Sequence, residues 1–214
     1  DFCLSRGLGD VYKRQAFGLF TAFSLTINPL TTNENLFFRK PLIGLVFSII
    51  CILGIIATSF PKQCSRASYS QKQQRNLAQH AVSITFRGHH TDCGKFSSHV
   101  IHISSHMLCA ACTGLLLGAV VSLVLATFYF FGGWHIEGMS FPLALIGIVG
   151  VTLGFFQLKF KGFIRLMLNA FFVLGAFLIL AGIDSLAQSL FVDLFLMVLI
   201  VFWLLTRILL SQWD

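Results

Sequence analysis

Charged residues are scarce in this chain of 214 residues. Only 11% of its residues are Asp, Glu, Lys or Arg, whereas about 25% is usual for soluble globular domains. Hydrophobic residues make up 56% of the sequence, and 24 residues are Phe. A soluble domain of this composition would have too little polar surface to cover its core, while a bilayer accepts apolar side chains on the outside. The composition therefore excludes an ordinary soluble domain and predicts an integral membrane protein.

Acidic residues are the scarcer of the two charged classes. There are 8 Asp and Glu against 15 Lys and Arg, which gives a net charge of +7. Nucleic-acid binding would need a basic groove with aromatic stacking platforms, and most aromatic residues here lie inside the apolar runs. We therefore expect no nucleic-acid partner, and the basic residues are better explained by membrane topology.

The chain also lacks an initiator Met. Residues 1–15 are similar to translated sequencing-adaptor read-through at the ends of open reading frames from environmental sequencing. We therefore expect this segment to have no biological role, the native N-terminus to be missing and the absence of a signal peptide to be uninformative.

Long apolar runs predict the fold class, an all-α integral membrane protein built as a bundle of five or six transmembrane helices. About 20 residues at 1.5 Å each cross a hydrocarbon core of about 30 Å. A sixth, shorter run adjoins the suspected adaptor and is interpreted as a truncated first span. The five full runs are 42–60, 107–131, 140–158, 164–183 and 189–210, and the sixth is 16–30.

The runs divide the chain into four parts. These are the suspected adaptor at 1–15, an N-terminal hairpin at 16–60, a polar segment at 61–106 and a four-helix bundle at 107–214.

The loops differ in their content of Lys and Arg, which are retained on the cytoplasmic side. Segment 61–106 holds six basic residues against the single acid Asp92, and Lys159, Lys161 and Arg165 lie between two later runs. The loops at 132–139 and 184–188 contain acids and no Lys or Arg. The pattern predicts a multi-pass protein of the cell membrane with segment 61–106 and the C-terminus in the cytoplasm. Arg39 and Lys40 are the one discord, because they would lie outside.

Segment 61–106 divides in two. Residues 61–79 are polar and basic, which predicts a solvated linker or short surface helix that touches anionic lipid headgroups. From residue 80 to 112 the composition changes, because six of the seven His and three of the six Cys lie there. This concentration is the main chemical feature of the sequence.

Two short ligand pairs stand within that stretch. His90 and Cys93 are separated by two residues, as are Cys109 and Cys112, and fifteen residues lie between the pairs. This spacing is similar to a zinc site of two CxxC pairs with one Cys replaced by His. Two intervening residues let a tight turn direct both side chains at one ion, and Gly94 supplies the permissive backbone that such a turn needs.

The residues between the pairs predict how they would meet. Residues 99–103 are rich in β-branched side chains, and Ser104 and Ser105 follow as a turn, which predicts a small hairpin. We therefore predict a cytoplasmic His/Cys-rich hairpin or knuckle that binds Zn²⁺. Its ligands are His90, Cys93, Cys109 and Cys112, with His89 as the first substitute for His90 and Asp92, His99, His102 and His106 as further alternatives.

A site with four protein ligands is structural rather than catalytic. It leaves no open position for a substrate water, and no Glu stands nearby as a general base. The sequence therefore favours a membrane protein without enzymatic activity.

Two other interpretations of the cysteines stay open. Cys109 and Cys112 are also compatible with simple packing at a helix start, where buried Cys is common. They would alternatively serve a membrane thiol-disulfide oxidoreductase, since a helix N-terminus stabilises a thiolate. The predicted cytoplasmic location opposes disulfide formation. Thr113 follows the second Cys where a c-type haem attachment needs His.

The stretch from His89 to Gly118 resembles a family signature. The family comprises prokaryotic multi-pass membrane proteins classed as a domain of unknown function, in which a His/Cys segment and a hairpin-like stretch precede Cys-Ala-x-Cys-Thr-Gly at the start of a helix. This chain has Cys109-Ala-Ala-Cys-Thr-Gly114, with Ala111 where many members have a basic residue. The resemblance implies the His/Cys site and names no activity.

A few polar and small residues stand out inside the apolar runs. Asp193 lies about one turn inside the last run, where we expect it to reach water as an interfacial or helix-capping residue. The alternative role is ion or proton handling in a small ion or solute transporter. Asn169 is expected to donate an interhelical hydrogen bond, and Gly114 and Gly118 to allow close packing of a helix within the bundle or, alternatively, between two copies of the chain.

Overall fold

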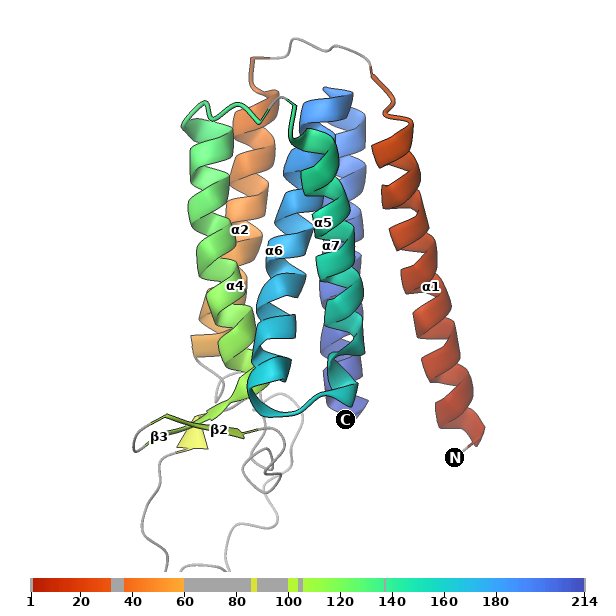
Figure 1. Ribbon diagram of the computed structural model, residues 1–214, viewed down its shortest axis with the longest axis vertical. Helices are drawn as coiled ribbons and strands as arrows, with labels where there is room; N and C mark the ends of the chain where they lie inside the picture. The colour runs from red at the N-terminus through yellow and green to blue at the C-terminus, as the bar shows by residue number, and fades with distance from the viewer. Residues whose placement is uncertain are drawn as a thin grey trace, which may run out of the picture.

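The fold is a bundle of helices with a small sheet at one end (Figure 1). The computed structural model describes residues 2–31, 37–59, 86–87, 100–103, 106–136 and 138–213. The helices are α1 (Phe2–Ile27), α2 (Arg39–Ser59), α4 (Ala110–Ala126) continued by the π-helical η3 (Thr127–Phe131), α5 (Ser140–Phe155) continued by the 3₁₀ turn η4 (Phe156–Lys159), α6 (Gly162–Ala187) and α7 (Leu190–Trp213). The strands are β1 (Phe86–Arg87), β2 (Val100–Ile103) and β3 (His106–Cys109).

Four of these helices are long and apolar enough to cross a membrane. They are α2, α4 with η3, α6 and the part of α7 from Leu190 to Arg207. Helix α5 is apolar but has only 16 residues, and α1 contains four of the five charged residues of the 1–15 segment. The predicted helical membrane bundle is thus confirmed at the level of four candidate spans, and a total of five or six stays a prediction.

The outer surface of the bundle is apolar. Leu53 is 60% exposed, Ile146 57% and Val198 69%, although each lies in the middle of a helix. Contact of these apolar side chains with water would be unfavourable, whereas lipid tails solvate them. The surface therefore suits a lipid environment.

Strands β2 and β3 lie where the sequence predicts the two arms of a small hairpin. The two strands pair antiparallel, with Val100 opposite Cys109 and Ile103 opposite His106, and β1 adds a parallel third strand to β3. The predicted turn residues Ser104 and Ser105 lie outside the described residues. Strand β3 leads directly into α4, so the sheet is joined to the bundle without a linker.

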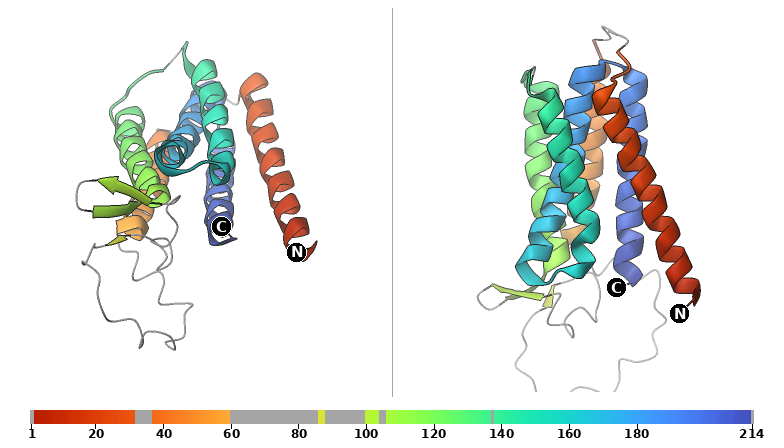
Figure 2. Two further views of the ribbon diagram at one scale, coloured as in Figure 1. Left: turned by 60° about the horizontal axis from the view of Figure 1, so that its bottom comes forward. Right: turned by 45° about the vertical axis from the view of Figure 1, so that its right-hand side comes forward.

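The sheet and both chain ends lie at the same end of the bundle, here called the sheet end (Figures 1 and 2). The opposite end, here called the loop end, contains the C-terminal end of α1, the start of α2, the end of η3, the start of α5 and the connection from α6 to α7 (Figure 1). The strands of segment 61–106 that the structure describes therefore lie at the same end as the C-terminal end of α7, while the location of the rest of the segment and the cytoplasmic assignment stay predictions.

Glycines let the helices that flank α6 approach its backbone. A Cβ atom at Gly114 of α4 would overlap the carbonyl oxygen of Leu166, and one at Gly118 would lie 2.7 Å from that of Ala170. On the other side, a Cβ at Gly147 of α5 would lie 2.6 Å from the oxygen of Gly175. The pair of glycines in α4 therefore serves packing within the chain.

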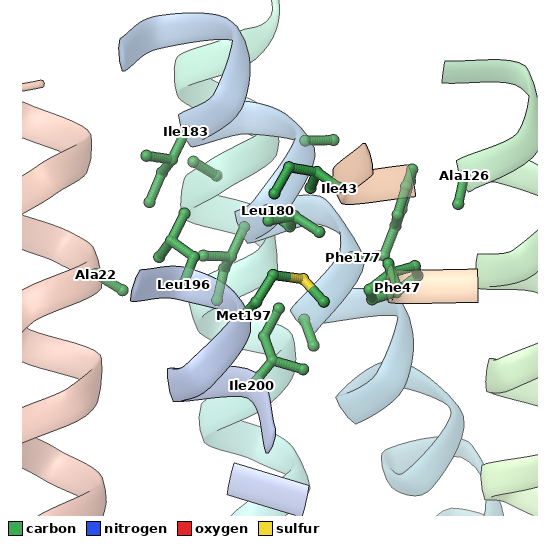
Figure 3. Close-up of a cluster of buried hydrophobic side chains, with 14 of the residues drawn as sticks. Ala22, Ile43, Phe47, Ala126, Phe177, Leu180, Ile183, Leu196, Met197 and Ile200 are labelled. Carbon is green, nitrogen blue, oxygen red and sulfur yellow. The ribbon is translucent and has the colours of Figure 1, made fainter. Parts of the chain in front are cut away.

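A cluster of buried apolar side chains runs through the bundle, and Figure 3 shows part of it. Phe47 of α2 packs against Phe177 of α6, with ring centroids 5.8 Å apart. Ile43 of α2 lies near Leu180 of α6, with Met197 of α7 beside them (Figure 3). All five are buried. This core holds α2, α6 and α7 together.

Candidate functional site

A buried ionic cluster lies at the loop end. Arg39, the first residue of α2, contacts two acids through one nitrogen: its Nη1 lies 2.6 Å from Asp184 Oδ1 and 2.5 Å from Asp193 Oδ2. Both carboxylates are completely buried, and the Arg39 side chain is only 6% exposed. Arg39 thus joins three helices through charge-assisted hydrogen bonds.

The short connection between α6 and α7 brings the two acids together. Gln188 ends α6 in the left-handed conformation, with φ of 48°, and its backbone N–H donates to the Asp184 carbonyl at 3.1 Å. Such a left-handed residue ends a helix sharply. Asp184 stands one turn before this connection and Asp193 in the first turn after it. Two acids nine residues apart therefore share one partner.

Tyr129 completes the cluster from η3. Its hydroxyl donates to Asp184 Oδ2 at 2.6 Å and lies 3.2 Å from the Ala181 carbonyl oxygen. The π-helical turns place this ring at the buried side of the helix, and such local widening is often found at functional positions. The Lys40 ammonium lies 5.1 Å from the centre of the same ring, at the margin of the cluster.

Apolar side chains close the cluster toward the bundle interior. Ile43, Leu180 and Met197 lie four positions from Arg39, Asp184 and Asp193 along their helices, which places each one turn deeper. The three charged groups therefore have hydrocarbon on that side, in a medium where ionic interactions are strong and bare charges are costly.

The ionic cluster corrects the expected exposure of Asp193 and explains the unexpected location of Arg39. Asp193 was expected to reach water, but it is fully buried because the fold of α6 and α7 covers it. The discord of Arg39 with the charge pattern disappears because Asp184 and Asp193 neutralise it. The sequence held a clue, since a cation and two acids were all predicted near the same membrane face.

A second polar cluster lies toward the sheet end and was missed from the sequence. Arg207 of α7 donates from Nε to Asn169 Oδ1 at 3.1 Å and from Nη2 to Gln157 Oε1 at 2.6 Å, and Nη2 also contacts Asn169 Oδ1. All three residues are buried. Asn169 therefore accepts its interhelical hydrogen bonds, and its own amide donates within α6, to the Arg165 carbonyl at 2.6 Å.

Arg165 also differs from its predicted location. It was expected in a loop with Lys159 and Lys161, but it belongs to the first turn of α6 and is only 5% exposed. The apolar run 164–183 already includes position 165, so the loop assignment came from the charge of Arg165 and not from the hydropathy of the run.

The predicted metal ligands are described only in part. Cys109 is the buried N-cap residue of α4, and Cys112 is half-buried in the first turn of that helix. The Thr113 hydroxyl donates to the Cys109 carbonyl at 2.9 Å. His89, His90 and Cys93 lie outside the described residues. Among the residues that are described, no group of three or more His, Cys, Asp or Glu side chains is placed to hold a metal ion.

Comparison with known proteins gives no relative from which a role could be transferred. The chain matches no protein-family model, no curated protein and no solved structure.

Proposed function

We propose that this chain is a membrane protein whose His/Cys segment binds a structural Zn²⁺ at the sheet end. The ligands are His90, Cys93, Cys109 and Cys112, with His89 as the substitute for His90. The ion ties segment 61–106 to the start of α4 on the cytoplasmic face, and membership of the family with the Cys-Ala-x-Cys-Thr-Gly motif belongs to the same proposal.

The observation that supports the proposal is the position of β3. The hairpin of β2 and β3 ends at Cys109, and α4 begins at the next residue, so Cys109 and Cys112 stand at the junction of sheet and helix. Ligands at the end of a hairpin and in the first turn of the following helix are typical of structural zinc sites. Residues before β2 need only return to this junction to complete the set.

Metal analysis of the purified full-length protein tests the proposal. We expect about one zinc ion per chain, and loss of most of it in both Cys109→Ser and Cys112→Ser, because each removes a thiolate ligand. Cys51→Ser is the matched control: this thiol is buried inside α2, eight residues before the last residue of the helix, and its loss should leave the zinc content unchanged.

Two outcomes would contradict the zinc site. A metal-free protein with a readily reducible disulfide between Cys109 and Cys112 would favour the membrane thiol-disulfide oxidoreductase. Zinc content that is equal in the Cys109→Ser, Cys112→Ser and Cys51→Ser variants would show that any bound ion lies elsewhere.

A further inference from the structure

The ionic cluster at the loop end contains more negative than positive groups. Asp184 and Asp193 both contact a single nitrogen of Arg39, so their carboxylate oxygens lie close to each other. Lys40 lies beyond the Tyr129 ring and is partly exposed. If both acids were ionised, the buried centre would have one uncompensated negative charge.

Asp184 and Asp193 differ in how many of their carboxylate oxygens accept a hydrogen bond. Asp184 accepts from Arg39 through Oδ1 and from Tyr129 through Oδ2. Asp193 accepts from Arg39 through Oδ2, but its Oδ1 is buried and has no hydrogen-bond partner among the described residues. A bare carboxylate oxygen in an apolar setting is costly, whereas a protonated carboxyl has no net charge there.

We propose that Asp184 and Asp193 form a proton-binding site, in which the pair shares one exchangeable proton. Two carboxyls held this closely repel each other strongly when both are ionised. Proton release leaves two carboxylates against Arg39, and the proton passes to water at the loop end, where the cluster is nearest to the surface. The occupant is a proton rather than a metal cation because Arg39 already places a positive charge between the acids.

The groups that surround the pair come from each neighbouring element. Helix α2 supplies Arg39 and Lys40, and η3 supplies Tyr129. On α5, the neutral Ser140 hydroxyl donates at 2.8 Å to the hydroxyl of Ser185, the residue that follows Asp184. His135 is exposed in the connection between η3 and α5, on the same end of the bundle.

Infrared spectroscopy of the full-length protein in lipid vesicles tests the proposal. At neutral pH we expect the carbonyl stretch of one protonated, buried carboxylic acid per chain, shifted by transfer to D₂O and lost when the pH is raised. Asp193→Asn and Asp184→Asn should each abolish the band, because one remaining carboxylate is neutralised by Arg39. Asp92→Asn, which changes an acid outside the pair, should keep it.

The wild-type spectrum alone tests whether the acid pair holds a proton, even if a variant fails to fold. No protonated carboxyl band at neutral pH in the folded protein would overturn the proposal, as would a band that persists in both variants. A spectrum without the band, combined with thermal stability that rises in sodium relative to choline buffer, would assign the site to a metal cation and overturn it as well.

Discussion

At the scale of single residues, the contacts of Arg39 account for both its location at the loop end and the attachment of α2 to the bundle. Arg39, like the adjacent Lys40, lies on the face that should have few cations and so contradicts the positive-inside pattern. The structure pairs it with Asp184 and Asp193, so the loop end gains little net charge from it. The same contacts hold the first residue of α2 to α6 and α7, which links topology to packing.

Replacement of Arg39 by Ala should destabilise the protein strongly. The change leaves buried carboxylates without their cation, and removal of one partner from a buried ion pair costs about 3–5 kcal/mol in the free energy of unfolding. The loss should shrink as the pH falls, because protonated Asp184 and Asp193 need no cation. Reversible unfolding in mixed micelles with increasing SDS measures both effects.

Lys40→Ala is the matched control for this prediction. Lys40 is adjacent in sequence and makes a cation–π contact with Tyr129, which is worth about 0.5–1 kcal/mol at a partly exposed site. Equal unfolding free energies for the Arg39→Ala and Lys40→Ala variants would show that the ionic cluster contributes no stability.

At the scale of elements, hydropathy and strand propensity predicted most of what is seen. The apolar runs became helices, and the β-branched stretch at 99–103 became β2. Patterns within one element could not predict which elements meet, because Arg39 and Asp193 are 154 residues apart. Arg207 was overlooked inside an apolar run for the same reason, since its partners Asn169 and Gln157 belong to other segments.

The approach of α5 to α6 depends on glycine. At Gly147 an added Cβ would lie 2.6 Å from the Gly175 oxygen and 2.7 Å from the Ile179 nitrogen, both of them backbone atoms that cannot move aside cheaply. Gly147→Ala should therefore lower the free energy of unfolding by about 1–3 kcal/mol, as overpacking does elsewhere. The same unfolding assay measures it.

Gly54→Ala is the control that separates the effect of close helix packing from the effect of helix propensity. A Cβ at Gly54 of α2 would meet nothing within 4 Å, so this variant should be neutral or up to about 1 kcal/mol more stable. If Gly147→Ala were as stable as Gly54→Ala, the close approach of α5 and α6 would not be important for stability.

At the scale of the whole molecule, the bundle has two chemically different ends. The sheet end holds Cys109, Cys112 and the cluster around Arg207, while the loop end holds the cluster around Arg39. The distribution of Lys and Arg predicted which segments share an end. It could not predict the ionic cluster, because burial and partners depend on tertiary contacts.

Every proposal here depends on the bundle crossing a membrane with its two ends on opposite sides. Labelling of intact cells with a membrane-impermeant thiol reagent, followed by peptide mass spectrometry, tests this most directly. Trp134→Cys places a thiol at a 54% exposed position of the loop end, and the native Cys64 lies in segment 61–106. We predict that the cysteine at position 134 is labelled in intact cells and Cys64 only after permeabilisation. Labelling of both positions from the same side would contradict the account.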